Sequence, residues 1–116
     1  MNVDIDKRSF EFALKIIQLI NDLPKTTAGN AIGQQIIRSG TSIGANVQEA
    51  LGAHSKSDFI YKMNIAKSEA RETKYWLKLL IGSQLIVSSQ IEWLLSEVDE
   101  LVAILTTIVK NTKKNL

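Results

Sequence analysis

Three glutamates and one histidine are the first side chains whose types suggest chemistry. Glu49, Glu69 and Glu72 fall at helical spacing beside apolar residues, so they could face the inside of a helical bundle. Carboxylate-bridged metal sites in such bundles need Glu-x-x-His pairs on two helices. His54 is the only histidine, and the Glu69-x-x-Glu72 pair lacks an imidazole. The sequence therefore predicts that the protein holds no metal ion and no other cofactor.

No arrangement of residues typical of a catalytic nucleophile is visible in the sequence. Cysteine is absent, which excludes a disulfide scaffold, a thiolate metal site and a cysteine nucleophile. Gly40-Thr41-Ser42 lacks the Gly-Lys-Ser/Thr ending of a phosphate-binding loop. Small helical ribonucleases that use an arginine a few residues before a histidine are a rival class, but the nearest arginine before His54 is Arg38. We predict that the protein is not an enzyme and has no catalytic residue.

Basic residues recur along one predicted helix at spacings of four, three and four. They are Lys67, Arg71, Lys74 and Lys78, and Lys62 is included as an extension of this basic stripe. Such a line of cations suits the phosphates of a nucleic acid, where each contact adds sequence-independent, salt-sensitive affinity. Specific reading of bases is not indicated, because no aromatic residue is interleaved in the stripe except near Tyr75 and Trp76.

The other interpretation of the basic stripe is a solvated helix face. Its cations would then be neutralised in part by carboxylates of the same helix or of the following one. These carboxylates are Glu69, Glu72, Glu97, Asp99 and Glu100. The sequence leaves both interpretations open.

Apolar residues at spacings of three and four predict the helices that carry these side chains. We expect helices at about residues 6–22, 30–51, 57–81 and 89–111, joined by short loops. Four amphipathic helices with short connections must alternate in direction, so the prediction is an all-α, antiparallel, up-and-down four-helix bundle over residues 1–116. In the first helix the residues expected to face the core are Phe10, Ala13, Ile16, Ile17 and Ile20. The apolar seam of the third helix is predicted to be Phe59, Met63, Ala66, Ala70, Thr73, Leu77 and Leu80, and that of the fourth Ile91, Leu94, Val98, Leu101, Leu105 and Ile108.

The ends of the helices carry their own signals. Pro24 should stop the first helix, and Gly52 is expected to end the second in a left-handed conformation. Ser55 with Asp58, and Ser89 with Glu92, have the spacing of capping boxes for the third and fourth helices, and Ser57 is a rival cap for the third. The last residues, from Asn111 onward, are expected to fray.

The second predicted helix has three distinct lines of residues. Its core face contains Ile36, Ile43, Val47 and Ala50. A line of small residues, Gly33, Gly40 and Gly44 with Ile37, would let another helix approach closely. A polar line contains Ser39, Ser42, Asn46 and Glu49. We expect a partly buried polar ladder, in which Glu49 or Glu72 accepts hydrogen bonds from Arg38, Asn46 or a neighbouring chain.

The composition places further bounds on function. The chain has 116 residues, 45% of them apolar, and a net charge of +2, so only a local patch of charge can indicate a partner. No stretch approaches the roughly 20 apolar residues that cross a bilayer. We expect a cytoplasmic protein that does not interact with membranes. Large apolar residues outside the seams, namely Ile60, Tyr61, Ile65, Trp76, Ile81 and Trp93, are consistent either with a subunit interface or with wide core faces.

Three segments of this chain together resemble a bacterial protein family. They are Arg38-Ser-x-x-Ser42-Ile43-x-x-Asn46-Val47-x-Glu49-Ala50, Ser57-Asp58-Phe59, and Ala66 with Glu69-x-x-Glu72-Thr73-x-Tyr75-Trp76-Leu77. The sequence is similar to the four-helix-bundle proteins encoded in intervening sequences of 23S ribosomal RNA genes. That family, also labelled the S23 ribosomal protein family, includes the accessory variability proteins of diversity-generating retroelements.

The resemblance implies properties that residue spacing alone does not show. It implies a ring-shaped homo-oligomer, with five subunits in relatives, and a basic surface that binds RNA or DNA; the retroelement relatives also bind a reverse transcriptase. It identifies Arg38, Ser42, Asn46, Glu49 and Glu72 as a family signature that fixes helix packing or a subunit contact. The leading hypothesis is a non-enzymatic, nucleic-acid-associated accessory protein. The alternative is a structural or adaptor module whose homo-oligomeric ring binds another protein.

Overall fold

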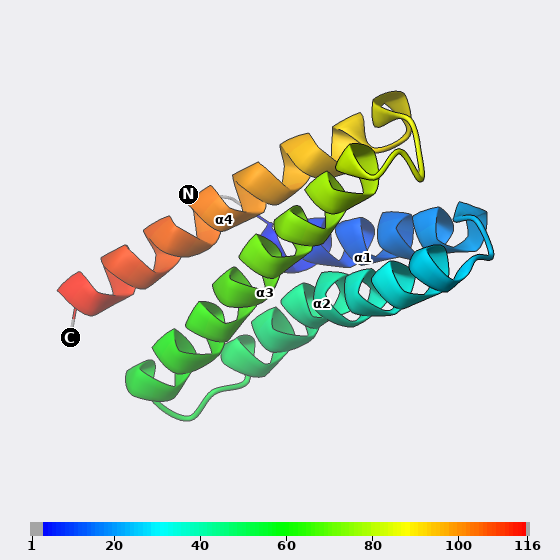
Figure 1. Cartoon of the computed structure of the whole chain (residues 1–116). Helices are drawn as coiled ribbons and strands as arrows, with labels where there is room; N and C mark the ends of the chain where they lie inside the picture. The colour runs from blue at the N-terminus through cyan, green and yellow to red at the C-terminus, as the bar shows by residue number, and fades with distance from the viewer. Residues whose placement is uncertain (1–3, 116) are drawn as a thin grey trace.

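Four helices and one short 3-10 turn make up the described part of the chain, residues 4–115 of the computed structural model. The helices are α1 (Ile5–Asp22), α2 (Thr27–Leu51), α3 (Lys56–Gly82) and α4 (Glu92–Lys114), and the turn is η1 (Ser88–Gln90). Consecutive helices run in opposite directions and pack against each other, and α4 also packs against α1 (Figure 1). The predicted all-α, up-and-down four-helix bundle is thereby confirmed. Met1–Val3 and Leu116 lie outside the described residues.

The molecule is elongated, with extents of 48 × 21 × 19 Å. Its α1–α2 side and its α3–α4 side face away from each other, because α2 packs on α3 and α4 packs on α1 (Figure 1). No helix in residues 4–115 combines the length and the apolar character needed to cross a membrane.

Local capping interactions set the helix boundaries. Thr26 accepts a hydrogen bond from the backbone N–H of Gly29 at 3.0 Å, so α2 begins at Thr27, three residues before the predicted start. Ser55 caps α3 as predicted, by accepting from the N–H of Asp58 at 3.0 Å. The residue after Asp22, Leu23, is extended because proline follows it, and α1 ends there as predicted.

Three predictions about helix ends are wrong. Gly52 has φ −95° and not the left-handed conformation, and the left-handed residue of the α3–α4 connection is Gln84, with φ 63°. Ser89 does not cap α4, because residues 88–90 form a 3-10 turn and α4 starts at Glu92 with no side-chain cap. The predicted fraying from Asn111 is not seen up to Lys114, since the helix continues to that residue.

The core is the apolar seam where the four helices meet. The seams predicted for α3 and α4 are buried except at Phe59 and Ile108, which are half-buried. The buried residues include Met63, Ala66, Leu77, Leu101 and Leu105. Burial of such side chains contributes roughly 1.5–3 kcal/mol each before conformational entropy is subtracted.

The core face of α1 differs from the prediction. The buried residues are Ile5, Ser9, Phe12, Ile16 and Leu19. Phe10 is 64% exposed and Ile17 is 41% exposed, although both were expected in the core. The physical reason is that α1 has two apolar lines at helical spacing, and the one containing Phe12, Ile16 and Leu19 packs inward. The other, which contains Phe10, Leu14 and Ile17, is left on the outside.

The line of small residues on α2 brings α1 and α2 close together, as predicted. A methyl group added at Gly40 would lie 2.9 Å from Cγ1 of Ile16, and one at Gly44 would lie 3.3 Å from Oγ of Ser9. Both distances are shorter than ordinary van der Waals contact. Glycine at these positions therefore allows Ser9 and Ile16 of α1 to lie directly against the α2 backbone.

Candidate nucleic-acid interface

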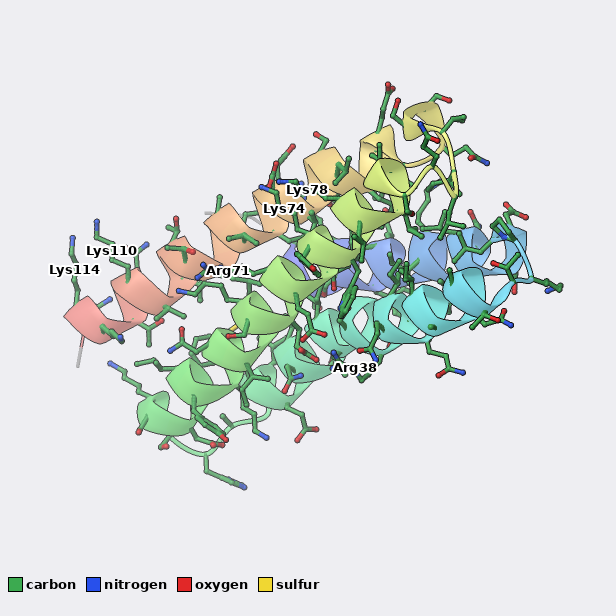
Figure 2. All side chains as sticks on the ribbon, viewed as in Figure 1. Arg38, Arg71, Lys74, Lys78, Lys110 and Lys114 are labelled. Atoms are coloured by element: carbon green, nitrogen blue, oxygen red, sulfur yellow. The ribbon has the colours of Figure 1, made fainter. Side chains whose placement is uncertain are left out.

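The basic stripe lies on the α4 side of α3. Lys67, Arg71, Lys74 and Lys78 follow one another along this side, next to the buried seam. Figure 2 shows Arg71, Lys74 and Lys78. Arg71 and Lys78 are exposed, and Lys67 and Lys74 are half-buried. Lys62 does not continue the line, because it is displaced by about 140° around the helix from Lys67. Its ammonium group lies instead 5.9 Å from the centre of the Tyr61 ring.

The carboxylates that could neutralise the stripe are mostly engaged elsewhere. Arg38 of α2 forms ion pairs with Glu69, at 3.1 Å, and with Glu72. Because they pair with Arg38, both glutamates are on the α2 side of α3 and so point away from the stripe. They are therefore balanced by a cation of another helix.

Two of the carboxylates of α4 are likewise held by another arginine. Arg8 of α1 donates two hydrogen bonds to Glu97, from Nε at 2.9 Å and from Nη2 at 2.7 Å, and a further one to Glu100 at 2.9 Å. Glu97 is 8% exposed, so this forked pair satisfies a charge that would otherwise be costly to bury. The hydrogen bonds to Glu97 and Glu100 raise the pKa of the Arg8 guanidinium above its ordinary value.

Only one ion pair of the stripe occurs among residues 4–115. It joins Nζ of Lys74 to Oδ1 of Asp99 at 2.7 Å. Lys67, Arg71 and Lys78 form no ion pair with the described part of the chain. The interpretation of the stripe as a face neutralised by its neighbours therefore holds for Lys74 alone.

Two cations that the sequence interpretation left out extend this positive surface. Lys110 lies about three helical turns beyond Asp99, and hence on the same face of α4. Lys114 is one turn further, and both are exposed at the free end of the helix (Figure 2). The spacing of 11 residues between Asp99 and Lys110 already indicated that they share a face of α4. The sequence interpretation considered only the carboxylates of this helix.

The signature residues of the polar ladder do not form one network. Glu72 accepts hydrogen bonds from Arg38 and, at 3.0 Å, from the indole Nε1 of Trp76, which confirms the expected Arg38–Glu72 contact. Ser42 and Asn46 donate to carbonyl groups one turn earlier in their own helix, at 2.6 and 2.8 Å. The side chain of Glu49 is exposed and makes no hydrogen bond with the described residues. Among the five signature residues, only Arg38 and Glu72 join two helices.

A buried hydroxyl pair makes a second polar contact between α2 and α3. The hydroxyl groups of Ser39 and Thr73 are both fully buried and hydrogen bond to each other at 2.8 Å. Thr73 also hydrogen bonds to the Glu69 carbonyl oxygen, at 2.7 Å. The sequence placed Ser39 on the polar line and Thr73 in the apolar seam, and it gave no indication that they meet.

Replacing Thr73 with valine should lower the free energy of unfolding by about 1–3 kcal/mol, because the buried Ser39 hydroxyl then lacks this partner. Urea denaturation measures the change. The double variant Ser39→Ala/Thr73→Val should recover much of the loss, since it removes both hydroxyls. The control is Thr106→Val, which removes only a bond of 2.7 Å to the carbonyl of Val102 in the same helix. Equal losses of unfolding free energy in Thr73→Val and Thr106→Val would show that the hydrogen bond between Ser39 and Thr73 does not stabilise the fold.

The remaining candidates for chemistry are not assembled into a site. His54 is exposed in the α2–α3 connection. Within residues 4–115, no three histidine, aspartate or glutamate side chains lie close enough together to hold a metal ion.

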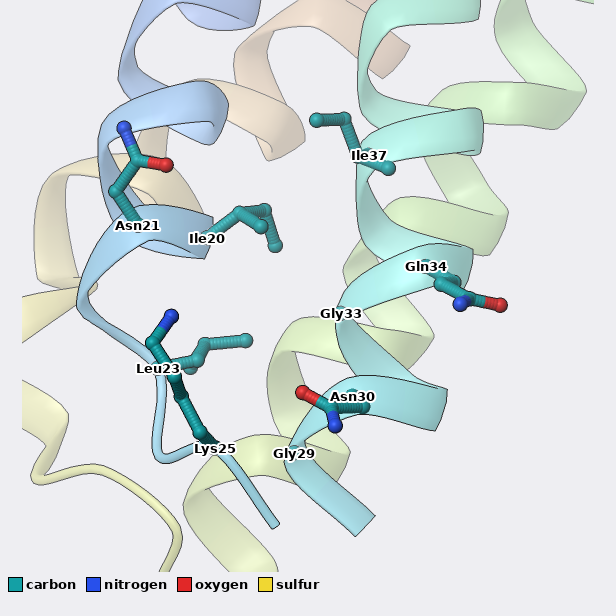
Figure 3. Close-up of a pocket in the computed structure, with 9 residues that line it drawn as sticks. All are labelled: Ile20, Asn21, Leu23, Lys25, Gly29, Asn30, Gly33, Gln34 and Ile37. Carbon is teal, nitrogen blue, oxygen red and sulfur yellow. The ribbon is translucent and has the colours of Figure 1, made fainter. Parts of the chain in front are cut away.

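A pocket of about 320 Å³ lies between the end of α1 and the start of α2 (Figure 3). Its walls are amide and apolar side chains and the backbone of Gly29 and Gly33, and Lys25 is the one titratable group of its lining. No second titratable side chain lines the pocket to act with Lys25, so we assign it no catalytic role.

The geometry defines a class of protein: an up-and-down four-helix bundle with a positively charged α3–α4 side and an arginine–glutamate tie between α2 and α3. Within that class, the chain belongs to the 23S rRNA-intervening sequence protein family, whose model matches residues 1–107. The family resemblance noted in the sequence is thereby confirmed.

One solved structure supports the assignment. The chain is similar to a protein of unknown function from the S23 ribosomal protein family of Bacteroides thetaiotaomicron, with 42% sequence identity and a TM-score of 0.83. The match covers 91% of this chain and 98% of that one. Comparison with curated proteins yields no match.

Proposed function

We propose that this protein is a non-enzymatic accessory protein that binds the phosphate backbone of RNA or DNA through the α3–α4 side. The observation that carries the proposal is that Lys67, Arg71 and Lys78 form no ion pair with the described residues, while Arg38 and Arg8 hold four glutamates of α3 and α4. Exposed cations without nearby counter-charges attract polyanions and release their condensed counterions.

The direct test is a binding titration of the native protein with labelled RNA and DNA over a series of salt concentrations. The logarithm of the association constant should fall steeply and linearly with the logarithm of the salt concentration, because each contacted phosphate contributes about −0.7 to −0.9 to the slope. If the protein bound neither RNA nor DNA at low salt, or bound them with an affinity independent of salt, the proposal would be wrong. A protein partner alone would then be the better interpretation of the family resemblance.

Replacing the three unpaired cations should weaken binding in a defined way. Lys67→Ala/Arg71→Ala/Lys78→Ala is expected to reduce the salt slope by about 2 and the affinity at physiological salt by roughly 50-fold. The matched control is Lys7→Ala/Lys15→Ala/Lys25→Ala, which removes the same net charge from exposed positions on and after α1. Similar losses in both triple variants would indicate attraction by net charge and not by the stripe.

We further propose that the protein forms a homo-oligomer through the exposed face of α1. This apolar α1 face consists of Phe10, Leu14 and Ile17, which are 64%, 46% and 41% exposed. They line an almost wholly apolar groove of about 340 Å³, whose α2 wall includes Gly44 and Ala45. Contiguous exposed apolar surface typically marks an interface. The family resemblance implies a ring of identical subunits. We therefore propose that a second copy of the chain fills this groove.

The native mass in solution tests this second proposal. Light scattering after size exclusion should give a multiple of the 12.9 kDa chain, and five copies would match the resemblance. A mass of one chain would overturn it and leave the apolar α1 face without a partner.

A further inference from the structure

We infer that the α3–α4 side binds single-stranded nucleic acid, with an unpaired base stacked on Tyr75 and the flanking phosphates held by Arg71 and Lys78. This inference depends on the proposed function, because it specifies the form of nucleic acid that the same surface takes. Its starting point is an open groove of about 410 Å³ on α3, lined by Arg71, Lys74, Tyr75, Lys78 and Leu79.

The groove combines positive charge with an aromatic surface. Tyr75 is 58% exposed and Leu79 is 36% exposed, so both present apolar area to solvent between the cations. Arg71 precedes Tyr75 by four residues and Lys78 follows it by three, so the two cations lie about one helical turn away on either side. Proteins that bind single strands combine these two elements: a positive track for the backbone and an aromatic ring on which a base stacks.

The ring of Tyr75 packs against a neighbour that is itself held in place. It contacts Trp76 edge-to-face, with ring centroids 5.1 Å apart and an interplanar angle of 71°. The Trp76 indole donates to Glu72, which is also paired with Arg38. The Arg38–Glu72 tie therefore supports the ring indirectly, and less conformational freedom is lost when a base stacks on it.

The surroundings of the groove favour one strand over two. In a duplex the base faces are already stacked on each other, so only an unpaired base can pack on Tyr75. The cations of the groove also form a single line on α3, bordered on α4 by Asp99, whose side chain is 57% exposed. A second strand lying across α4 would meet this carboxylate.

The experiment compares labelled oligo(U), oligo(dT) and a DNA duplex of equal length by fluorescence anisotropy at fixed low salt. The native protein should bind the single strands more tightly than the duplex. Tyr75→Ala should weaken single-strand binding by about 5- to 150-fold and leave duplex binding nearly unchanged, whereas Tyr75→Phe should retain most of the affinity. The control is Tyr61→Ala, which removes an equally exposed tyrosine of α3 that does not line the groove.

The outcomes separate this inference from the function on which it depends. Salt-sensitive binding with equal affinity for duplex and single strand, or with no loss in Tyr75→Ala, would overturn the inference and leave the proposed function intact. No binding to any of the three probes would overturn both. The oligo(U) and oligo(dT) arms show whether the surface distinguishes RNA from DNA.

Discussion

A Gly29→Ala variant is expected to lose about 3 kcal/mol of unfolding free energy, the largest loss we predict for a single added methyl group. The new Cβ would overlap the carbonyl oxygen of Pro24 and lie 3.2 Å from its carbonyl carbon. Both are backbone atoms beside a ring that fixes φ, so the turn cannot yield as a flexible side chain would. Moving α2 away would also stretch the cap between Thr26 and the Gly29 N–H.

The measurement is a denaturant or thermal unfolding curve, with Gly82→Ala as the matched control. Gly82 is the last residue of α3, and a Cβ there would meet no atom within 4 Å. That variant should therefore be neutral or gain up to about 1 kcal/mol, because alanine favours the helix more than glycine does. A Gly29→Ala protein as stable as the native one would show that the α1–α2 turn relaxes freely.

Changing the apolar α1 face should convert the homo-oligomer to single chains. In Phe10→Glu/Leu14→Lys, two large exposed apolar side chains are lost from the proposed contact, which should raise the dissociation constant roughly 100-fold or more. The new pair has Glu four residues before Lys, an arrangement that stabilises a helix, and net charge is unchanged. Light scattering should then give the 12.9 kDa mass of one chain at concentrations where the native protein is assembled.

The control for that variant is Tyr61→Glu/Val87→Lys. It makes the same chemical change at two apolar residues that are 61% and 63% exposed but do not line the groove of the apolar α1 face. It should leave the native mass unaltered. An oligomer that survives Phe10→Glu/Leu14→Lys would place the subunit contact on another face.

The sequence predicted α3 and α4 better than α1, for a reason that lies in their patterns. The seam from Met63 to Leu80 repeats at three and four without a competing line, so only one face can turn inward. In α1, Phe10, Leu14 and Ile17 compete with Phe12, Ile16 and Leu19 at the same spacing. Periodicity cannot choose between two such lines. The small Ser9 decides the packing in part, since it fits against Gly44 of α2.

The positions of the basic stripe were predictable, but its electrostatic state was not. Spacing along one helix places Lys67, Arg71, Lys74 and Lys78 on a common side. Whether that side is neutralised depends on where arginines of other helices lie. Arg38 is 31 residues from Glu69 and Arg8 is 89 residues from Glu97, and no local pattern pairs residues so far apart.

The placement of the basic stripe and the apolar α1 face on opposite sides of the bundle has a consequence for avidity. Because α1–α2 and α3–α4 face away from each other, covering one side leaves the other free (Figure 1). A particle joined through α1 would present one basic surface per subunit, and a strand long enough to reach two of them would bind the second as an intramolecular event. Linking of this kind can raise affinity by about 10²- to 10⁴-fold without a new contact. Strand length, more than base sequence, would then determine which nucleic acids the assembly retains.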